Sequence, residues 1–245
     1  MRAALVLICL AGPLLAQDLA PDTSLTPMAR PDPEDREEIV APEAQDALTP
    51  PVRVGLTETD DAFEACLADL DNYRTVYETR DAVSDPSDGD CGITRPVMVS
   101  EIVPGLTLQP DAMMRCETAV ALAEWTARIV LPAAEMMEEK GAVTGIDHGS
   151  TYICRRRNNA ATGKLSEHSF GNAVDVMGFR FEDGTSLAIE PRADAGTIEE
   201  AFQRAVRGGA CLSFTTVLGP GTDATHDDHL HLDVKSRKGG YRICQ

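Results

Sequence analysis

The stretch Ser166-Glu167-His168-Ser169-Phe170-Gly171-Asn172-Ala173-Val174-Asp175 and the later stretch His226-Asp227-Asp228-His229-Leu230-His231 together contain four of the chain's five histidines. Side chains alternate between the two faces of a β-strand. A strand through the later stretch therefore places His229, His231 and Asp233 on one face and the leucines on the other. The apolar face is predicted to pack into the core, and the imidazoles are predicted to face a cleft.

The first stretch is predicted to behave similarly at its end. Alternation puts Asp175 on the face opposite its valine neighbours, and Gly171 supplies a turn between His168 and the strand that carries Asp175. A catalytic zinc site needs three protein ligands and an open fourth position. His168 and Asp175, with either His231 or His229, would supply the three ligands.

The combined pattern resembles a known signature. Ser166-x-His168-x-x-Gly-x-Ala-x-Asp175 followed by His229-x-His231 is similar to the motif of a group of zinc peptidases. That group contains D-alanyl-D-alanine metallo-carboxypeptidases, murein endopeptidases, lysostaphin-type enzymes and the hedgehog signalling domain. Within it, residues 150–235 look most like the bacterial extensin-like C-terminal domain family, and the resemblance extends over roughly residues 55–245.

The resemblance implies roles for individual residues. His168, Asp175 and His231 would bind Zn²⁺. His229 would lie beside the metal as a base or as a group that stabilises the developing oxyanion.

Two further residues of the later stretch have weaker parallels in this group. His226 matches an additional active-site histidine of the murein endopeptidases. Asp228 stands where the D-alanyl-D-alanine dipeptidases have a glutamate base, but it is one methylene shorter. The base is therefore either His229, which we rank first, or Asp228.

The implied function is that of an exported zinc-dependent peptidase that hydrolyses peptide bonds in peptidoglycan stem peptides or cross-links. The resemblance leaves open whether it is a D,D-carboxypeptidase or an endopeptidase. The main alternative is a non-catalytic cell-wall-binding or signalling module that keeps the zinc-site architecture, as hedgehog does. A hydrolase acting on another peptide or amide is a third possibility.

Arg155, Arg156 and Arg157 form the dense basic run of an acidic domain. A guanidinium group is well suited to binding a substrate carboxylate. Arg155 is the first candidate for substrate binding because it follows Cys154, and Arg157 is the second. The alternative is that the run is a solvated loop.

The N-terminal region predicts export. A basic start and a short apolar run that ends in Ala16 indicate a signal peptide over residues 1–16, and no other segment is apolar enough to span a membrane. Residues 17–51 are acidic, rich in proline and poor in aromatic residues, which predicts a disordered linker. A wall-binding or partner-binding tail is the alternative for this segment. Residues 52–245 have the length of one domain.

The net charge of −18 argues against a nucleic-acid partner. We expect instead a monomer that is periplasmic or secreted and that binds peptidoglycan peptides. Beyond Cys9 of the signal peptide, an even number of cysteines predicts three disulfides. These cysteines are Cys66, Cys91, Cys116, Cys154, Cys211 and Cys244. Pairing in chain order, 66–91, 116–154 and 211–244, is one of 15 possibilities and is our preferred one.

The pattern of elements predicts an α+β domain, with an antiparallel sheet that carries the zinc site and helices packed on one side. Helical spacing is seen over 61–73, over 111–140 with Pro110 in its first turn, and over 197–207 with Thr197 as the N-cap. Strands are expected at 97–103, 150–154 and 230–234, and a hairpin-like turn at 179–185. Trp125 is expected in the core, and His148 is expected to be a surface or turn histidine without a metal role.

Overall fold

A computed structural model describes residues 52–192 and 194–245. The predicted signal peptide (1–16) and linker (17–51) lie outside the described residues. The main sheet has nine strands in the order β1-β4-β5-β6-β7-β10-β9-β11, with β8 paired to β7. These strands are β1 Val76–Thr79, β4 Pro96–Val103, β5 Leu106–Arg115, β6 Val143–His148, β7 Ala173–Phe181, β8 Ser186–Ala188, β9 Thr216–Leu218, β10 Leu230–Asp233 and β11 Ile243–Cys244.

A small second sheet pairs β2 (Val83–Ser84) with β3 (Gly92–Ile93). The α-helices are α1 Val52–Gly55, α2 Asp60–Asn72, α3 Cys116–Trp125, α4 Leu131–Ala134 and α5 Ile198–Ala210, with a π-helical turn, η3 Thr126–Val130, between α3 and α4. The 3₁₀ turns are η4 Arg157–Asn159, η5 Glu167–Phe170, η6 Ala224–His226 and η7 Lys238–Gly240.

The predicted α+β class is confirmed, but the sheet is mixed and not purely antiparallel. Most neighbouring strands are antiparallel, whereas β5 pairs with β6 and β9 pairs with β11 in parallel. The chain between β5 and β6 passes through α3, η3 and α4, which is the kind of long helical crossover that parallel neighbours require.

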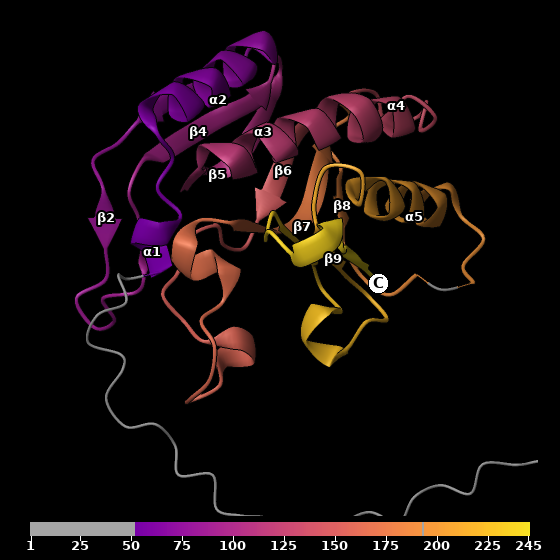
Figure 1. Ribbon diagram of the computed structural model, residues 1–245. Helices are drawn as coiled ribbons and strands as arrows, with labels where there is room; N and C mark the ends of the chain where they lie inside the picture. Colours follow the sequence, from indigo (N-terminus) through magenta and orange to yellow (C-terminus); the bar gives the residue numbers. More distant parts are fainter. Residues whose placement is uncertain (1–51, 193) are drawn as a thin grey trace, which may run out of the picture. The chain divides into compact units, whose positions relative to one another are not determined.

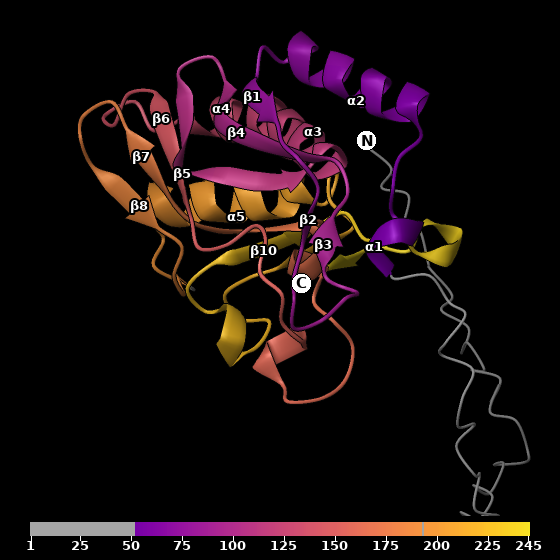
Figure 2. The same cartoon turned by 90° about the vertical axis from the view of Figure 1, so that its left-hand side faces the viewer.

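Helices α3, α4 and α5 lie together on one side of the sheet (Figures 1 and 2). Trp125 of α3 is fully buried, as expected, and its indole N–H donates to the Val206 carbonyl of α5 at 2.8 Å. Its ring packs against Phe179 of β7. Phe179 in turn packs edge to face against Phe202 of α5, with a distance of 5.1 Å between the ring centroids. The core therefore lies between this helical layer and one face of the sheet, which leaves the other face for a site.

A register shift in β7 lets one strand serve both the site and the core. Between Asp147 and His148 of β6, the pairing with β7 skips from Gly178 to Val176, which is a bulge. The bulge changes the phase of alternation. Before it, Asp175 faces away from the core, and after it, Phe179 packs into the core.

The prediction of a helix over 111–140 is wrong at both ends, since α4 ends at Ala134 and residues 135–140 are not helical. Residues up to Arg115 belong to β5, and Pro110, expected in a first helical turn, lies inside that strand. Buried side chains in β5 alternate with less buried ones, as at Leu106 and Leu108, and again at Ala112 and Met114. Residues 112–115 pair with β4, and this pairing outweighs the helical spacing. The helix begins at Cys116.

The strand predicted at 150–154 is also wrong. The strand is β6, which ends at His148, and residues 150–154 run as irregular chain beside η5. The other predicted elements are present as α2, β4, the β7–β8 hairpin, α5 and β10. In α5, the Thr197 hydroxyl accepts from the Glu200 N–H at 3.2 Å, as an N-cap should.

Three disulfides are present, but two of the three preferred pairings are wrong. Only the pairing of Cys211 with Cys244 is confirmed. The other disulfides are Cys66–Cys116 and Cys91–Cys154. Helix α2 packs along α3, which brings Cys66 to the first residue of α3, and β3 contacts η5, which brings Cys91 to the adjacent loop. The disulfide pairing is decided by the packing of elements that are distant in sequence, and it cannot be predicted from the order of the cysteines along the chain.

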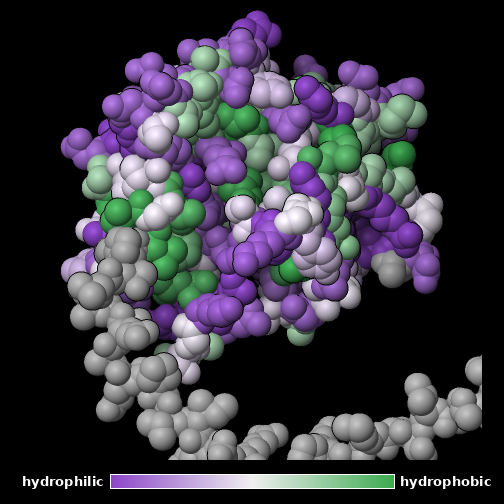
Figure 3. Space-filling model, in the orientation of Figure 1, coloured by the Kyte–Doolittle hydropathy of each residue, from purple (hydrophilic) through white to green (hydrophobic). Residues whose placement is uncertain are grey.

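On the face drawn in Figure 3, hydrophilic residues predominate and the hydrophobic ones form separate areas. Among the described residues, no helix has both the length and the apolar character needed to cross a bilayer.

Candidate metal centre

Three side chains from the two histidine-containing stretches converge on one point. His168 Nε2 lies 3.1 Å from Asp175 Oδ1 and 3.1 Å from His231 Nδ1, and His231 Nδ1 lies 2.9 Å from Asp175 Oδ1. His168 is fully buried, Asp175 is 7% exposed and His231 is half-buried, so the cluster opens on one side only.

Strand pairing explains why Asp175 and His231 meet. In the antiparallel β7–β10 pair, His231 stands directly opposite Asp175. Opposite residues share a face of the sheet, and their Cβ atoms are typically about 5 Å apart. Leu230 and Leu232 point to the other face, where both are fully buried. The predicted alternation is therefore present, and it fixes two of the three groups.

His168 is delivered by the short turn η5, which ends at Gly171. Gly171 has φ +66°, and a Cβ added there would lie 2.3 Å from the side chain of Ile93. A residue with a side chain fits neither the conformation nor the space. The Gly171 carbonyl accepts from the Arg115 N–H at 3.0 Å and from the Thr118 hydroxyl at 2.9 Å. Helix α3 and strand β5 thus hold the turn that positions His168.

The three groups influence one another's protonation. Burial lowers the pKa of His168, which keeps this imidazole neutral. Burial acts to raise the pKa of Asp175, but hydrogen bonds and charge from His168 and His231 outweigh it and hold that pKa well below its usual range. Burial acts to lower the pKa of His231, but Asp175 and Asp233 raise it to about 9. The cluster thus contains an anionic carboxylate between two imidazoles, one with a lowered pKa and one with a raised pKa.

His229 and Asp228 form a pair beside the cluster. His229 Nε2 lies 3.6 Å from Asp175 Oδ1, and its Nδ1 donates to Asp228 Oδ1 at 2.8 Å. The Asp228 side chain is 77% exposed and is directed toward His229 and not toward the ligand cluster. The structure therefore does not group Asp228 with the three converging residues.

His226 stands on η6 with its ring centroid 5.3 Å from that of His229 and 5.9 Å from that of His231. Its Nδ1 lies 2.8 Å from Asp223 Oδ1, which also accepts from the Thr225 N–H. His148 lies elsewhere, at the end of β6, with Nε2 2.6 Å from the Pro110 carbonyl oxygen.

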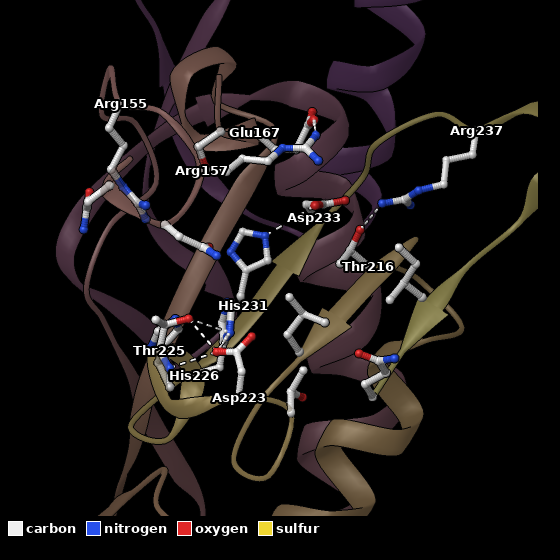
Figure 4. A pocket seen from close by; sticks show the side chains of 18 residues that line it. Arg155, Arg157, Glu167, Thr216, Asp223, Thr225, His226, His231, Asp233 and Arg237 are labelled. Atoms are coloured by element: carbon white, nitrogen blue, oxygen red, sulfur yellow. Dashed lines mark hydrogen bonds and ion pairs between the residues drawn. The ribbon is translucent and has the colours of Figure 1, made fainter. Parts of the chain in front are cut away.

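The cluster opens into a cavity of about 460 Å³, whose wall includes His226, His229 and His231. The two predicted substrate-binding arginines line the same cavity (Figure 4). Arg155 Nη2 lies 3.8 Å from Asp175 Oδ2, and Arg157 Nη2 lies 3.4 Å from Glu167 Oε1. Arg156 is instead paired with Asp88 and does not line the cavity.

Comparison with known proteins identifies the family. A family model described as extensin-like protein C-terminus matches residues 64–245. The chain belongs to the extensin-like C-terminal family. No curated protein and no solved structure matches the chain significantly.

In this extensin-like domain, two residues that support the cluster had no assigned role in the sequence analysis. Asp233 Oδ2 lies 3.3 Å from His231 Nε2, at the far side of that ring. The Ser150 hydroxyl donates to Asp175 Oδ2 at 3.0 Å and lies 3.3 Å from His168 Nδ1.

A sequence signal exists for only one of these two residues. The same alternation that aligned His229 with His231 extends to Asp233, so this residue could have been found. Ser150 could not, because its segment was expected to be a strand and nothing local links it to Asp175.

The donor set of the extensin-like domain fits a zinc ion. Four ligands at zinc bond lengths of 2.0–2.1 Å in a tetrahedron stand about 3.3 Å from one another. The three atoms here are separated by 2.9–3.1 Å, close to that spacing. Two imidazole nitrogens and one carboxylate oxygen also match the ligand types of catalytic zinc sites.

Proposed function

We propose that this protein is an exported zinc-dependent peptidase that hydrolyses peptide bonds in peptidoglycan stem peptides or cross-links. The observation that carries the proposal is the convergence of His168, Asp175 and His231 at zinc-like spacing, with His231 on the wall of an open cavity. Export is supported by the three disulfides, which are typical of proteins outside the reducing cytosol.

Hydrogen bonds at the far nitrogens support the assignment of the ligand atoms. Ser150 gives its single hydroxyl proton to Asp175, so it accepts from His168 Nδ1–H and leaves the lone pair of Nε2 toward the centre. Asp233 accepts from His231 Nε2–H and leaves Nδ1 toward the centre. Such partners are usual for zinc-binding histidines, because they fix the tautomer and the ring orientation.

A bound zinc ion would lower the pKa of a water molecule toward ~7 and polarise the scissile carbonyl group. The remaining steps belong to the chain's own side chains. Because His229 Nδ1–H is held by Asp228, the lone pair of Nε2 is available beside the cluster to take a proton and return it to the leaving amine. Asp228 then acts by orienting the base and is not itself the base.

His226 is held in the same way by Asp223, and its Nε2 is free to interact with the substrate on the cavity wall. Arg155 and Arg157, with Asn158 and Asn159, form one side of the cavity and provide positive charge there. Stem peptides are rich in carboxylates, so these guanidinium groups suit them.

The test is to incubate purified, zinc-loaded protein with purified muropeptides and to identify the products by mass spectrometry. The wild type should release products, and the cleaved bond would distinguish a carboxypeptidase from an endopeptidase. The His168→Ala variant should lose both the zinc and the products. Intact muropeptides after incubation with protein of verified zinc content would contradict the proposal, and binding to wall sacculi without release would favour a non-catalytic module.

A further inference from the structure

Arg237 is a half-buried cation that lines the cavity without a carboxylate partner. Its Nη1 donates to the Thr215 carbonyl at 3.0 Å, and its Nη2 donates to Thr216 Oγ1 at 2.6 Å. Across residues 52–192 and 194–245, no carboxylate oxygen lies within 4.0 Å of this guanidinium. Both known acceptors are neutral, and a guanidinium has five N–H donors, so donors remain for an anion.

The other charged side chains of the cavity already have partners. Glu167 is bound by Lys235 and Arg157, and Asp233 by His231. The third carboxylate of the wall, Asp223, is bound by His226. Arg155 faces Asp175, though at 3.8 Å. The Arg237 guanidinium is therefore the cation of the cavity that remains available to an anionic ligand, among the residues that the structure describes.

Strand pairing places Thr216, which accepts a hydrogen bond from the Arg237 guanidinium, close to His231. In the β9–β10 pair, Thr216 stands opposite Asp233 and Leu218 stands opposite His231. Thr216, which holds the guanidinium, is thus two positions along β9 from Leu218, the residue opposite His231, which is a distance of roughly 7 Å. An extended peptide covers that distance in about two residues.

Arg237 also lies apart from the first basic run. Figure 4 shows Arg155 and Arg237 on opposite sides of His231, with the dashed hydrogen bond from Arg237 to Thr216. Two apolar side chains, Leu218 of β9 and Ile243 of β11, line the cavity near Thr216, since Ile243 pairs with Thr216. A cation beside apolar surface suits a residue that has both a carboxylate and an aliphatic side chain.

We propose that Arg237 binds a free carboxylate of the substrate, one or two residues from the scissile bond, on the β9–β11 side of the metal centre. This inference rests on the proposed function, because it takes His231 to mark the reacting bond. It narrows the substrate class to peptides with a free carboxylate near the cut, whether it ends the main chain or belongs to a side chain.

Binding of two matched probes tests the inference separately from hydrolysis. N-acetyl-D-alanyl-D-alanine and its C-terminal amide differ only in the carboxylate. Each is titrated into zinc-free protein and followed by NMR chemical shifts, so the result does not depend on cleavage. We expect the wild type to bind the acid about tenfold or more tightly than the amide, as a charge-assisted hydrogen bond would give.

Three variants decide whether Arg237 is responsible. Arg237→Gln should abolish the preference for the acid, and Arg237→Lys should retain part of it. Arg242→Gln is the matched control, because Arg242 also donates to backbone carbonyls, those of Cys211 and Phe214, but does not line the cavity. It should keep the preference. Unchanged thermal melting of each variant verifies that the fold is intact.

Equal or absent binding of the two probes by the wild type would overturn the inference. So would a full preference in Arg237→Gln, or a preference lost in Arg155→Gln and kept in Arg237→Gln. If the protein cleaves no muropeptide but shows the Arg237-dependent preference, the peptidase proposal fails and the carboxylate site stands.

Discussion

At the scale of single residues, the site is defined by what lies behind each imidazole. Every histidine that faces the cavity or the ligand cluster has an oxygen partner on its far nitrogen. The pairs are His168–Ser150, His231–Asp233, His229–Asp228 and His226–Asp223. A hydrogen bond at one ring nitrogen fixes the orientation of the imidazole and its tautomer, so the other nitrogen points in a defined direction. Under the proposed function, two of these histidines would bind the metal ion and the other two would transfer protons beside it.

The first prediction separates His229 from the ligands. His229→Ala should lower kcat on the order of 10²–10⁴-fold, the usual contribution of a positioned base, while zinc content stays unchanged. Asp228→Asn should cost less, because the amide oxygen can still accept from His229 Nδ1–H and only the negative charge is lost. Steady-state kinetics with metal analysis by mass spectrometry measures both. Loss of zinc in His229→Ala would make it a ligand, and wild-type turnover would remove it from the mechanism.

The second prediction concerns the number of protons released when zinc binds. The pKa of His231 is raised to about 9, so this residue is protonated at pH 7 and must lose the proton to bind zinc. About one proton should be released per zinc bound at pH 7, and fewer as the pH approaches 9. Calorimetry in buffers with different ionisation enthalpies measures this number. A release that does not change between pH 7 and 9 would contradict the prediction.

The same shift makes the stability of the zinc-free protein depend on pH. A raised pKa stabilises the fold fully below the unfolded value of about 6.5, and this contribution is lost as the pH rises through about 9. It should be on the order of 3 kcal/mol. Denaturant unfolding should therefore show the wild type losing more stability than His231→Gln between pH 6.5 and 9. Parallel curves for the two proteins would refute the assignment.

At the scale of elements, the disulfides differ in what they hold. Cys91–Cys154 ties β3 to the loop that continues into Arg155, and this loop is bonded to η5, since the Arg155 N–H donates to Ser169 Oγ. Cys66–Cys116 joins α2 to α3, away from the cavity. The two close loops of similar length, with separations of 63 and 50 residues.

Removing either disulfide by paired Cys→Ser substitution should therefore cost a similar amount of stability, about 4 kcal/mol in the chain-entropy model. Only the Cys91/Cys154 variant should also raise KM for peptides, because only this bond holds the arginine loop and η5. Urea unfolding and kinetics below the melting temperature measure the two effects. An equal rise in KM in the Cys66/Cys116 variant would mean that KM reports general loosening.

Sequence patterns predicted some elements well and others poorly, for physical reasons. The alternation in β10 could be predicted because one face of the strand is apolar and the other is polar. The start of α5 could be predicted from its N-cap residue, Thr197. The end of β5 was mistaken for a helix because Met113 fits helical spacing with Cys116 and Val120, and only the pairing with the neighbouring strand β4 decides the matter. For the same reason, the role of Ser150 and the pairing of Cys91 with Cys154 could not be predicted. Contacts between distant segments produce no pattern in the local sequence.

At the scale of the whole molecule, an acidic chain surrounds its cavity with Arg155, Arg157 and Arg237. The negative surroundings would repel a carboxylate-rich peptide, so the basic wall is the place where one can be bound. Exposed charges are screened over about 8–10 Å at physiological salt, which limits the repulsion to close range. The proposed selectivity for anionic peptides would thus be a local property of the cavity and would not be set by the net charge.

Zinc should also stabilise the domain as a whole, because β7, β10 and η5 all contribute ligands and none binds the ion alone in the unfolded chain. At a free zinc concentration of 100 times Kd, the gain is about 2.7 kcal/mol, which raises the melting temperature of a domain of this size by about 5–10 °C. His168→Ala and Asp175→Ala should lose this shift on addition of zinc to chelator-treated protein. His226→Ala is the matched control, since His226 lines the same cavity but does not belong to the ligand cluster, and it should keep the shift. A wild type whose melting temperature is unchanged by zinc, or a His226→Ala variant that loses the shift while His168→Ala keeps it, would show that the cluster is not the metal centre and that its hydrogen bonds alone hold the three elements together.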